Sequence, residues 1–228
     1  MVANKNEFPK DGSGDCVTIL GFGSLLSEKS SRTTFPKLRN FRLGKVLDHR
    51  RVFAHPASIF FQRGIANHDT LEMSSLSVEY EKGCSMICSV FEVPNEGLFA
   101  ADAPGENVIP SQKFLEREEE FEITKVPYQD LQHGELKEGI ICRRSTDEAY
   151  IKRWGEDRFQ KNYIDYGINT IWGWTESSGI LPCPVYLRHC VLAAWNCDKS
   201  DDSWSEEGDG GECYNSFLDE TYRKQHIM

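Results

Sequence analysis

The chain has 228 residues, of which 39% are hydrophobic and 11% aromatic, and its formal net charge is −10. This length suits one large domain or two small ones with a sizeable core, and the composition is typical of a soluble globular protein. Nucleic acids and anionic membranes are bound through basic surfaces, so the acidic balance argues against both as partners.

The N-terminal segment, residues 1–14, is polar and contains glycine and proline, and we expect it to be flexible. It has no basic region followed by an apolar one, so no secretory signal is expected. No apolar run approaches the ~20 residues that are needed to span a bilayer. These features together predict a cytoplasmic protein.

Strand patterns predominate in the first part of the chain. Residues 15–22 are apolar on both faces, which predicts a central strand. The Lys82-Gly83 break between two β-rich runs predicts a hairpin. The predicted strands cover residues 15–22, 45–56, 71–80, 84–94, 121–128 and 139–144.

Helical patterns come mostly later. Ser145 or Thr146, together with Glu148, predicts a capping box at the start of a long charged helix. Because the strands come first and the helices follow, the order favours an α+β fold over an alternating one. The predicted helices cover residues 110–121, 145–167, 184–197 and 213–228, and the acidic, glycine-rich residues 198–212 between the last two are expected to form a flexible loop.

Eight cysteines are present, none of them in a C-x-x-C arrangement, and most lie inside apolar runs. In a reducing compartment we therefore expect buried thiols, with no disulfide and no bound metal. A zinc site from Cys84, Cys88 and a histidine stays as a weak alternative, because two thiols at this spacing on a strand would share one face without forming a chelating loop.

The stretch "ILGFGSLLSEK", residues 19–29, ends an apolar run with two glycines and a serine. It lacks the lysine of a phosphate-binding P-loop, the third glycine of a dinucleotide fingerprint and the second glycine of a nucleophile elbow. Gly21 and Gly23 are expected to allow unusual backbone dihedral angles. The turn is either a plain β-turn or a small concavity whose N–H groups bind an anion.

A second stretch, "FLEREEEFEITKVPY" (residues 114–128), is rich in glutamate. Helical periodicity places Glu118 on the apolar stripe of Phe114 and Phe121, whereas Glu119 and Glu120 are expected to point outward with Glu116. A carboxylate among apolar side chains has a raised pKa or a functional role. The competing interpretation is a structural ion pair with Arg117 or Lys113.

Taken in order, these stretches resemble the γ-glutamylcyclotransferase-like superfamily over roughly residues 16–145. "GFGSLL" resembles its Tyr-Gly-Ser-Leu turn, and "LEREEEFEITKV" resembles its Leu-Asp-x-x-Glu-x-x-Tyr segment. The resemblance implies one domain of this kind over residues 15–197, a small mixed β-barrel with flanking helices, followed here by a helical C-terminal extension. It also implies cyclisation of a γ-glutamyl group to 5-oxoproline with release of an amine or amino acid, without metal or cofactor.

Carried onto this chain, the resemblance gives Glu118 the place of the catalytic glutamate. It makes Phe22, Gly23, Ser24 and Leu25 the loop that grips a small zwitterionic γ-glutamyl substrate. Two residues depart from the family pattern: Phe22 stands where tyrosine is usual and so lacks a hydroxyl, and Glu116 stands in the place of the aspartate.

Three other classes of function stay open from the sequence. The first is a protein of the same fold that binds or senses a metabolite without converting it, which Phe22 and the long C-terminal addition favour. The second is a cysteine hydrolase using Cys142 or Cys190 with a histidine, although His189 and Cys190 would point apart on a helix. The third is a scaffold that acts through the acidic loop.

Overall fold

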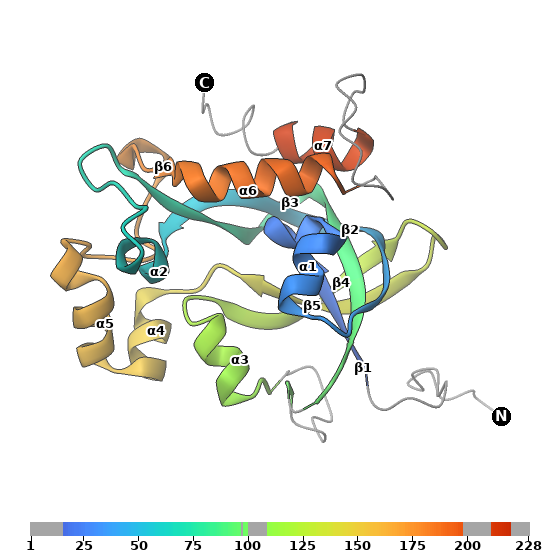
Figure 1. Ribbon diagram of the computed structural model, residues 1–228, viewed down its shortest axis with the longest axis horizontal. Helices are drawn as coiled ribbons and strands as arrows, with labels where there is room; N and C mark the ends of the chain where they lie inside the picture. The colour runs from blue at the N-terminus through green and yellow to red at the C-terminus, as the bar shows by residue number, and fades with distance from the viewer. Residues whose placement is uncertain (1–15, 97, 100–108, 198–210, 220–228) are drawn as a thin grey trace.

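The computed structural model describes residues 16–96, 98–99, 109–197 and 211–219 (Figure 1). The segment 1–14, which was predicted to be flexible, lies outside the described residues, as does 198–210, most of the predicted acidic loop.

Five strands close into a mixed β-barrel. They neighbour one another in the order β1-β5-β4-β2-β3, and a further pairing of β1 with β3 completes the ring. β1 and β5 run parallel, the other neighbours in the ring are antiparallel, and a short sixth strand, β6, pairs with β3 in parallel outside the ring. The strands are β1 (Cys16–Gly21), β2 (Arg39–Pro56), β3 (Glu72–Pro94), β4 (Glu122–Asp130), β5 (Leu136–Arg143) and β6 (Leu181–Pro182).

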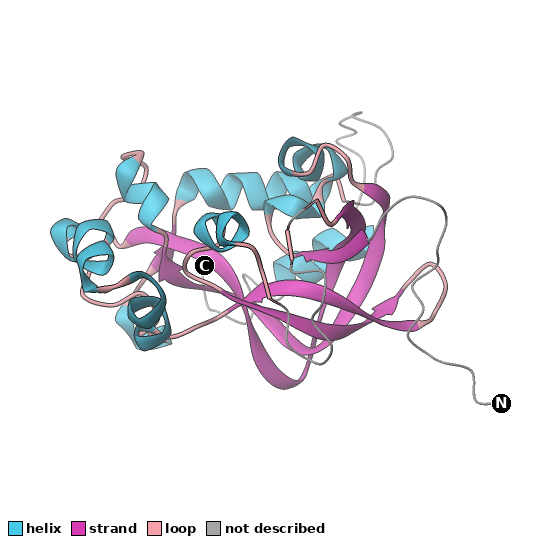
Figure 2. Cartoon of the chain, turned by 90° about the horizontal axis from the view of Figure 1, so that it is seen from below, coloured by secondary structure: helices cyan, strands magenta, loops and turns pink. Residues whose placement is uncertain are grey.

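Helices flank this barrel, with α6 and α7 together on one side and α3 on another (Figures 1 and 2). The predicted α+β class, a small mixed β-barrel with flanking helices and a helical C-terminal extension, is therefore confirmed. The helices are α1 (Glu28–Thr34), α2 (Ser58–Gln62), α3 (Gln112–Arg117), α4 (Asp147–Trp154), α5 (Glu156–Asn162), α6 (Pro184–Trp195) and α7 (Gly211–Leu218), with short 3-10 turns η1 (Ser24–Leu26), η2 (Ile164–Tyr166) and η3 (Glu176–Ser178).

The barrel interior is filled from several strands at once. Leu20 of β1 is 2% exposed and packs with Val46 of β2 and Val90 of β3. Ile19, its neighbour in the chain, points to the other face and joins a second cluster with Phe91 and Phe114. β1 is thus covered on both faces, as its continuous apolar sequence predicts.

The predicted hairpin at Lys82-Gly83 is wrong, because β3 continues through that point as one strand. Gly83 has φ +84 and donates its N–H to Oδ1 of Asp48, which itself has φ +55. The pairing of β2 with β3 shifts register there, between Leu47 and His49. Such a bulge bends and twists a strand without reversing it, and a bent strand can curve around a barrel.

The predicted single helix over 145–167 is also wrong, since the chain forms two helices. Thr146 caps the first of them, accepting the N–H of Ala149 at 3.1 Å, as a capping residue should. Gly155, with φ +86, ends α4 and starts α5. A residue with a side chain rarely takes this backbone conformation, so the glycine sets the break.

The C-terminal helices cover one side of the barrel. Proline stands at the first position of α6, where a missing N–H costs least. Cys190 and Ala194 of α6 are fully buried with Leu76 and Phe53 of the barrel and Phe217 of α7. In the described part of the chain, no helix is long and apolar enough to cross a bilayer.

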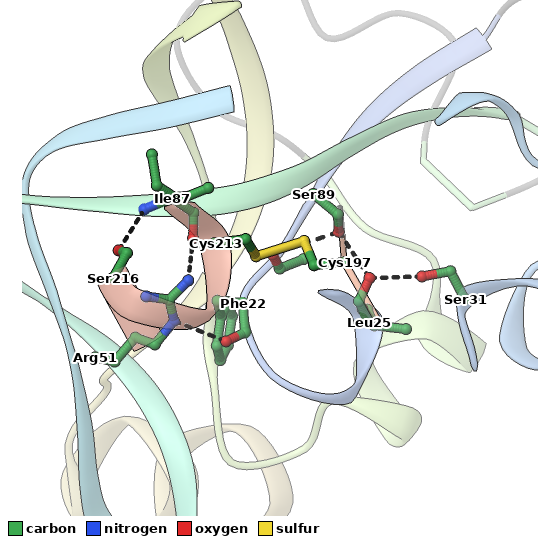
Figure 3. Close-up of a disulfide and its surroundings, with 10 residues drawn as sticks. Phe22, Leu25, Ser31, Arg51, Ile87, Ser89, Cys197, Cys213 and Ser216 are labelled. Atoms are coloured by element: carbon green, nitrogen blue, oxygen red, sulfur yellow. Dashed lines mark hydrogen bonds between the residues drawn. A yellow bond between two sulfur atoms is a disulfide. The ribbon is translucent and has the colours of Figure 1, made fainter. Parts of the chain in front are cut away.

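A disulfide joins Cys197, after α6, to Cys213 in α7, which corrects the expectation of no disulfide (Figure 3). Both cysteines are buried in the same cluster, and the other six are free. The sequence spacing gave no sign of the bond, because 16 positions separate the two cysteines and only the packing of α6 against α7 brings them together.

We expect this disulfide to stabilise the protein by about 3 kcal/mol, the value for closing a loop of this length. Reduction should lower the urea midpoint of the wild type but leave a Cys197→Ser/Cys213→Ser variant unchanged. Thiol titration in denaturant should find six thiols before reduction and eight after it. Eight thiols without reductant would contradict the bond.

Candidate functional site

The glycine-bearing turn at the end of β1 is tightly packed. A Cβ at Gly21 would lie 2.4 Å from Ser89 Oγ and 2.6 Å from the Leu25 side chain. The Leu25 carbonyl accepts hydrogen bonds from Ser31 and Ser89, both at 2.7 Å. The turn is therefore held against β3 and α1 at a distance that only glycine permits at position 21.

The expectation of unusual backbone dihedral angles is confirmed for Gly23, whose φ −124 and ψ −120 lie outside the helical and extended regions, although neither Gly21 nor Gly23 has a positive φ. Gly23 also allows close approach, because a Cβ there would lie 3.0 Å from the hydroxyl of Tyr186 and 3.5 Å from the sulfur of Cys190. Both of these residues belong to α6, so the C-terminal extension lies directly against the turn.

A buried arginine fixes the start of the same turn. Arg51 of β2 has no exposed surface, and its Nε donates to the Phe22 carbonyl at 2.8 Å. Its Nη2 donates to the Ile87 carbonyl of β3 (Figure 3). Its guanidinium lies 5.6 Å from the ring centre of Phe217. Ile87 in turn donates its N–H to Ser216 of α7 at 3.3 Å.

Glu118 follows directly after α3 and has a side chain that is 20% exposed. Burial raises the pKa of its carboxyl group, and the charge and hydrogen bond of Arg117 oppose that rise. Arg117 Nε donates to the carboxylate at 2.8 Å, and the Cys142 thiol of β5 also opposes the rise of the Glu118 pKa. The desolvation and the ion pair considered from the sequence are therefore both present.

A chain of polar groups joins this neighbourhood to the turn. Tyr186 lies beside Ser75 of β3 and beside Cys190, whose sulfur in turn lies beside the N–H of Ser24. Burial raises the pKa of Tyr186 well above its usual value, and Cys190 and the charge of Glu118 add to the rise. We call Tyr186, Cys190, Ser75 and the turn, with Glu118 close enough for its charge to act on Tyr186, the turn cluster.

Of the sequence-predicted site residues, the structure brings Gly23, Ser24 and Glu118 into the turn cluster. Phe22 contributes its carbonyl to Arg51 and its ring to the core, and Leu25 contributes its carbonyl to the two serines. A direct contact of Glu118 with the turn N–H groups stays a prediction, since the hydrogen bond to its carboxylate comes from Arg117.

The expectation that Glu119 and Glu120 point outward is wrong, because they are only 7% and 8% exposed. Helix α3 ends at Arg117, and the next residues form a turn closed by the Phe121 N–H on the Glu118 carbonyl at 3.0 Å. Glu118, Glu119 and Glu120 therefore lie beyond the end of the helix, and helical periodicity does not predict which of them are buried. Glu116, still in the helix, is exposed as predicted.

The two buried glutamates form a second carboxylate cluster beside α2 and α5. Glu119 accepts from Ser58 Oγ at 2.7 Å and pairs with Arg158, while Asn162 donates to it at 3.2 Å. Glu120 accepts from the Tyr163 hydroxyl at 2.8 Å and from the Ser58 N–H at 3.1 Å. Burial, followed by the charge of Glu119, raises the pKa of Glu120 to about 7.

Counted strictly from Leu115, the pattern Leu-Asp-x-x-Glu reaches Glu119 and not Glu118. The surroundings of the two carboxylates differ. The Glu119 carboxylate is held by Arg158, Ser58 and Asn162, whereas Glu118 lies close enough to Tyr186 for its charge to act on the tyrosine. Glu118 is therefore the carboxylate whose charge acts on Tyr186 beside the turn, and its role as a base stays a prediction.

The two thiols considered as nucleophiles are poorly suited to that role. Burial raises the pKa of Cys190 to about 12 and the pKa of Cys142 well above its usual value. A nucleophilic cysteine needs the opposite shift, because the thiolate is the reactive form. Within the described residues, no group of three or more His, Cys, Asp or Glu side chains is placed to hold a metal ion.

Sequence patterns missed Tyr186, Ser75 and Arg51. Tyr186 and Ser75 lie in segments predicted correctly as helix and strand, but nothing in the local pattern distinguishes them from neighbouring polar residues. Arg51 carried no signal of its own, because the same strand contains the charged residues Lys45, Asp48 and Arg50, and only Arg51 among them is fully buried.

No family model and no curated protein matches the chain. Among solved structures, an uncharacterized protein from Homo sapiens is similar with 10% identity over 89% of this chain and 98% of its own, at a TM-score of 0.49. A γ-glutamyl cyclotransferase is similar with 10% identity over 65% of this chain and 86% of its own, at 0.42. A protein from Arabidopsis thaliana has 10% identity over 65% and 89%, at 0.39.

The second carboxylate cluster makes stability depend on pH. The pKa of Glu120 is higher in the folded protein than in the unfolded chain, so its contribution is complete below about pH 4.5 and is lost as the pH rises through about 7. Glu120→Gln keeps an oxygen for Tyr163 and Ser58 but carries no charge. We expect this variant to be more stable than the wild type at pH 8 by about 1–3 kcal/mol.

Urea unfolding of both proteins between pH 5 and pH 8.5 checks this expectation. The exposed Glu116→Gln removes the same charge and should follow the wild-type pH dependence. If Glu120→Gln and the wild type lose stability in parallel as the pH rises, Glu120 does not carry the effect.

Proposed function

We propose that this protein cyclises a γ-glutamyl group to 5-oxoproline and releases the attached amine or amino acid. The observation that carries the proposal is the turn cluster, in which a partly buried carboxylate with a raised pKa shares one neighbourhood with a tightly packed glycine turn. The substrate class is a small zwitterion, and the reaction needs proton transfer and charge stabilisation.

Glu118 is the general base in this proposal. The α-ammonium of the substrate must lose a proton before its nitrogen can attack the γ-carbonyl carbon. The Glu118 carboxylate takes that proton and then gives it to the leaving nitrogen as the carbon–nitrogen bond breaks. Such transfer is worth ~10²–10⁴-fold in rate, and a raised pKa makes the carboxylate a stronger base while it stays ionised.

The turn provides the complementary part of the chemistry. Negative charge develops on the γ-carbonyl oxygen during attack, and fixed backbone N–H groups stabilise such charge without rearranging. Arg51 holds the Phe22 carbonyl, and Ser31 and Ser89 hold the Leu25 carbonyl, so both ends of the turn are anchored. The backbone N–H groups between these two carbonyl groups are thereby held in a fixed orientation.

A non-catalytic metabolite-binding role is the second candidate, and one observation favours it. The Tyr186 hydroxyl and the Cys190 sulfur lie 3.0 Å and 3.5 Å from the Cβ position of Gly23. Helix α6 thus takes up part of the turn that a substrate would use. In this alternative the turn cluster binds an amino-acid-like ligand and releases it unchanged.

Replacement of Glu118 by glutamine tests the catalytic assignment. Glutamine keeps the size and one acceptor oxygen but accepts no proton from an ammonium group. We expect release of 5-oxoproline from a γ-glutamyl amino acid to fall ~10²–10⁴-fold. Because the pKa of Glu118 is raised, wild-type activity should also decline on acidification at a pH above the usual range of a glutamate.

Three comparisons sharpen the result. Glu116→Gln removes an equal charge from an exposed position of α3 and should retain wild-type activity. Glu119→Gln tests the alternative count of the motif, and a loss confined to this variant would transfer the base to Glu119. If a panel of γ-glutamyl amino acids, γ-glutamylamines and glutathione is bound but never converted by the wild type, the non-catalytic role replaces this proposal.

A further inference from the structure

We propose that Tyr186 of α6 contacts the substrate and that its hydroxyl group, together with the Ser24 N–H, binds the α-carboxylate of the γ-glutamyl group. This inference rests on the proposed function and assigns a part of the site to the C-terminal extension. It also gives the site an orientation, with the substrate carboxylate toward Arg51 and the ammonium group toward Glu118.

The position of Tyr186 is the first argument. Its hydroxyl group would lie 3.0 Å from a Cβ at Gly23, so the hydroxyl approaches the turn as closely as the missing side chain allows. The aromatic ring of Phe60 lies 5.2 Å from that of Tyr186 and supports it from α2. Phe22, the residue before Gly23, has no hydroxyl group of its own, so Tyr186 supplies the phenol at this turn.

The surroundings of Cys190 are the second argument. The Tyr186 hydroxyl and the Cys190 sulfur lie 3.0 Å and 3.5 Å from the Cβ position of Gly23, and the Ser24 N–H lies beside the same sulfur atom. A thiol sulfur is a weak acceptor, whereas a carboxylate offers two strong acceptor oxygens. Two donors that converge on a weak acceptor form a favourable site for a carboxylate, which would take the place of the sulfur as their partner.

The distribution of charge is the third argument. Arg51 lies close enough to Cys190 to oppose the rise of its pKa, and Glu118 lies close enough to Tyr186 to add to the rise of the tyrosine pKa. The cluster therefore has the Arg51 guanidinium at one end and, at the other, the Glu118 carboxylate with its ion-pair partner Arg117. An amino-acid zwitterion placed along this direction has its carboxylate at the Arg51 end and its ammonium group beside the base.

Tyr186→Phe removes the hydroxyl group and keeps the ring that packs on Phe60. We expect KM for a γ-glutamyl amino acid to rise on the order of 10-fold, with kcat changed less than about threefold, because the carboxylate is bound equally in ground and transition states. The exposed Tyr80→Phe makes the same change at 61% exposure and should match the wild type. A fall in kcat alone would overturn the assignment to the carboxylate.

A substrate change separates substrate contact from a merely structural role. A 4-aminobutanoyl amide lacks only the α-carboxylate, so the wild type should prefer the γ-glutamyl compound, and Tyr186→Phe should reduce that preference about 10-fold. An unchanged preference would contradict the inference even if the variant lost stability. The proposed function would still stand, because 5-oxoproline release by the wild type is measured independently.

Binding provides a readout without turnover. Calorimetric titration of a γ-glutamyl amino acid into Glu118→Gln, and into the same protein with Tyr186→Phe added, should show about 10-fold weaker binding in the double variant. If the wild type converts no γ-glutamyl compound, the proposed function fails, and this titration still decides whether Tyr186 binds the carboxylate. Equal affinities would exclude the contact.

Discussion

The buried guanidinium of Arg51 connects the parts of the molecule on which the candidate site depends. It donates to the Phe22 carbonyl at the start of the turn and to the Ile87 carbonyl of β3, and it lies against Phe217 of α7. A buried guanidinium needs acceptors in place of water. The two carbonyl groups provide them, and the arginine in turn provides the donors that these carbonyl groups need. Each carbonyl left without its donor would cost about 1–3 kcal/mol. The turn, the barrel and the C-terminal helix are therefore tied to one side chain.

The two carboxylate clusters show how a short segment can supply two environments. Helix α3 ends at Arg117, and the following turn directs Glu118 toward Cys142 and Tyr186. Glu119 and Glu120 turn instead toward Ser58 and the side chains of α5 and its C-terminal end. Consecutive residues in a turn point in different directions, so Glu118 has other partners than Glu119 and Glu120. The chain thus separates a carboxylate near the turn from two that support the packing of α2 and α5.

Local patterns predicted the fold well where a residue or a run of residues is compatible with only one local structure. The apolar run of β1 requires cover on both faces, and Thr146 requires a helix after it, and both are found. Glycine was ambiguous: Gly83 makes a bulge rather than a hairpin, Gly155 divides a helix, and Gly23 allows close approach.

The candidate site was only partly predictable for a related reason. Gly23, Ser24 and Glu118 belong to stretches with a recognisable order along the chain, whereas Tyr186 and Cys190 reach the turn from α6, more than 150 positions later. Periodicity within one segment carries no information about which distant helix will cover it. The prediction that Glu119 and Glu120 are exposed was wrong for a similar reason. Helix α3 ends at Arg117 because of tertiary packing, and a helical wheel contains no information about that packing.

The Cys197–Cys213 disulfide also changes what a break in the chain would do. The bond joins the end of α6 to α7 across the connecting residues, so a protease that cut anywhere between residues 198 and 212 would leave two polypeptides that are still covalently linked. Phe217 would stay tethered near Arg51 after such a cut, and the side of the barrel that carries the turn would keep its cover. Only a cut combined with reduction would release α7, so the connecting segment is free to vary, or to be processed, without detaching the helix that it precedes.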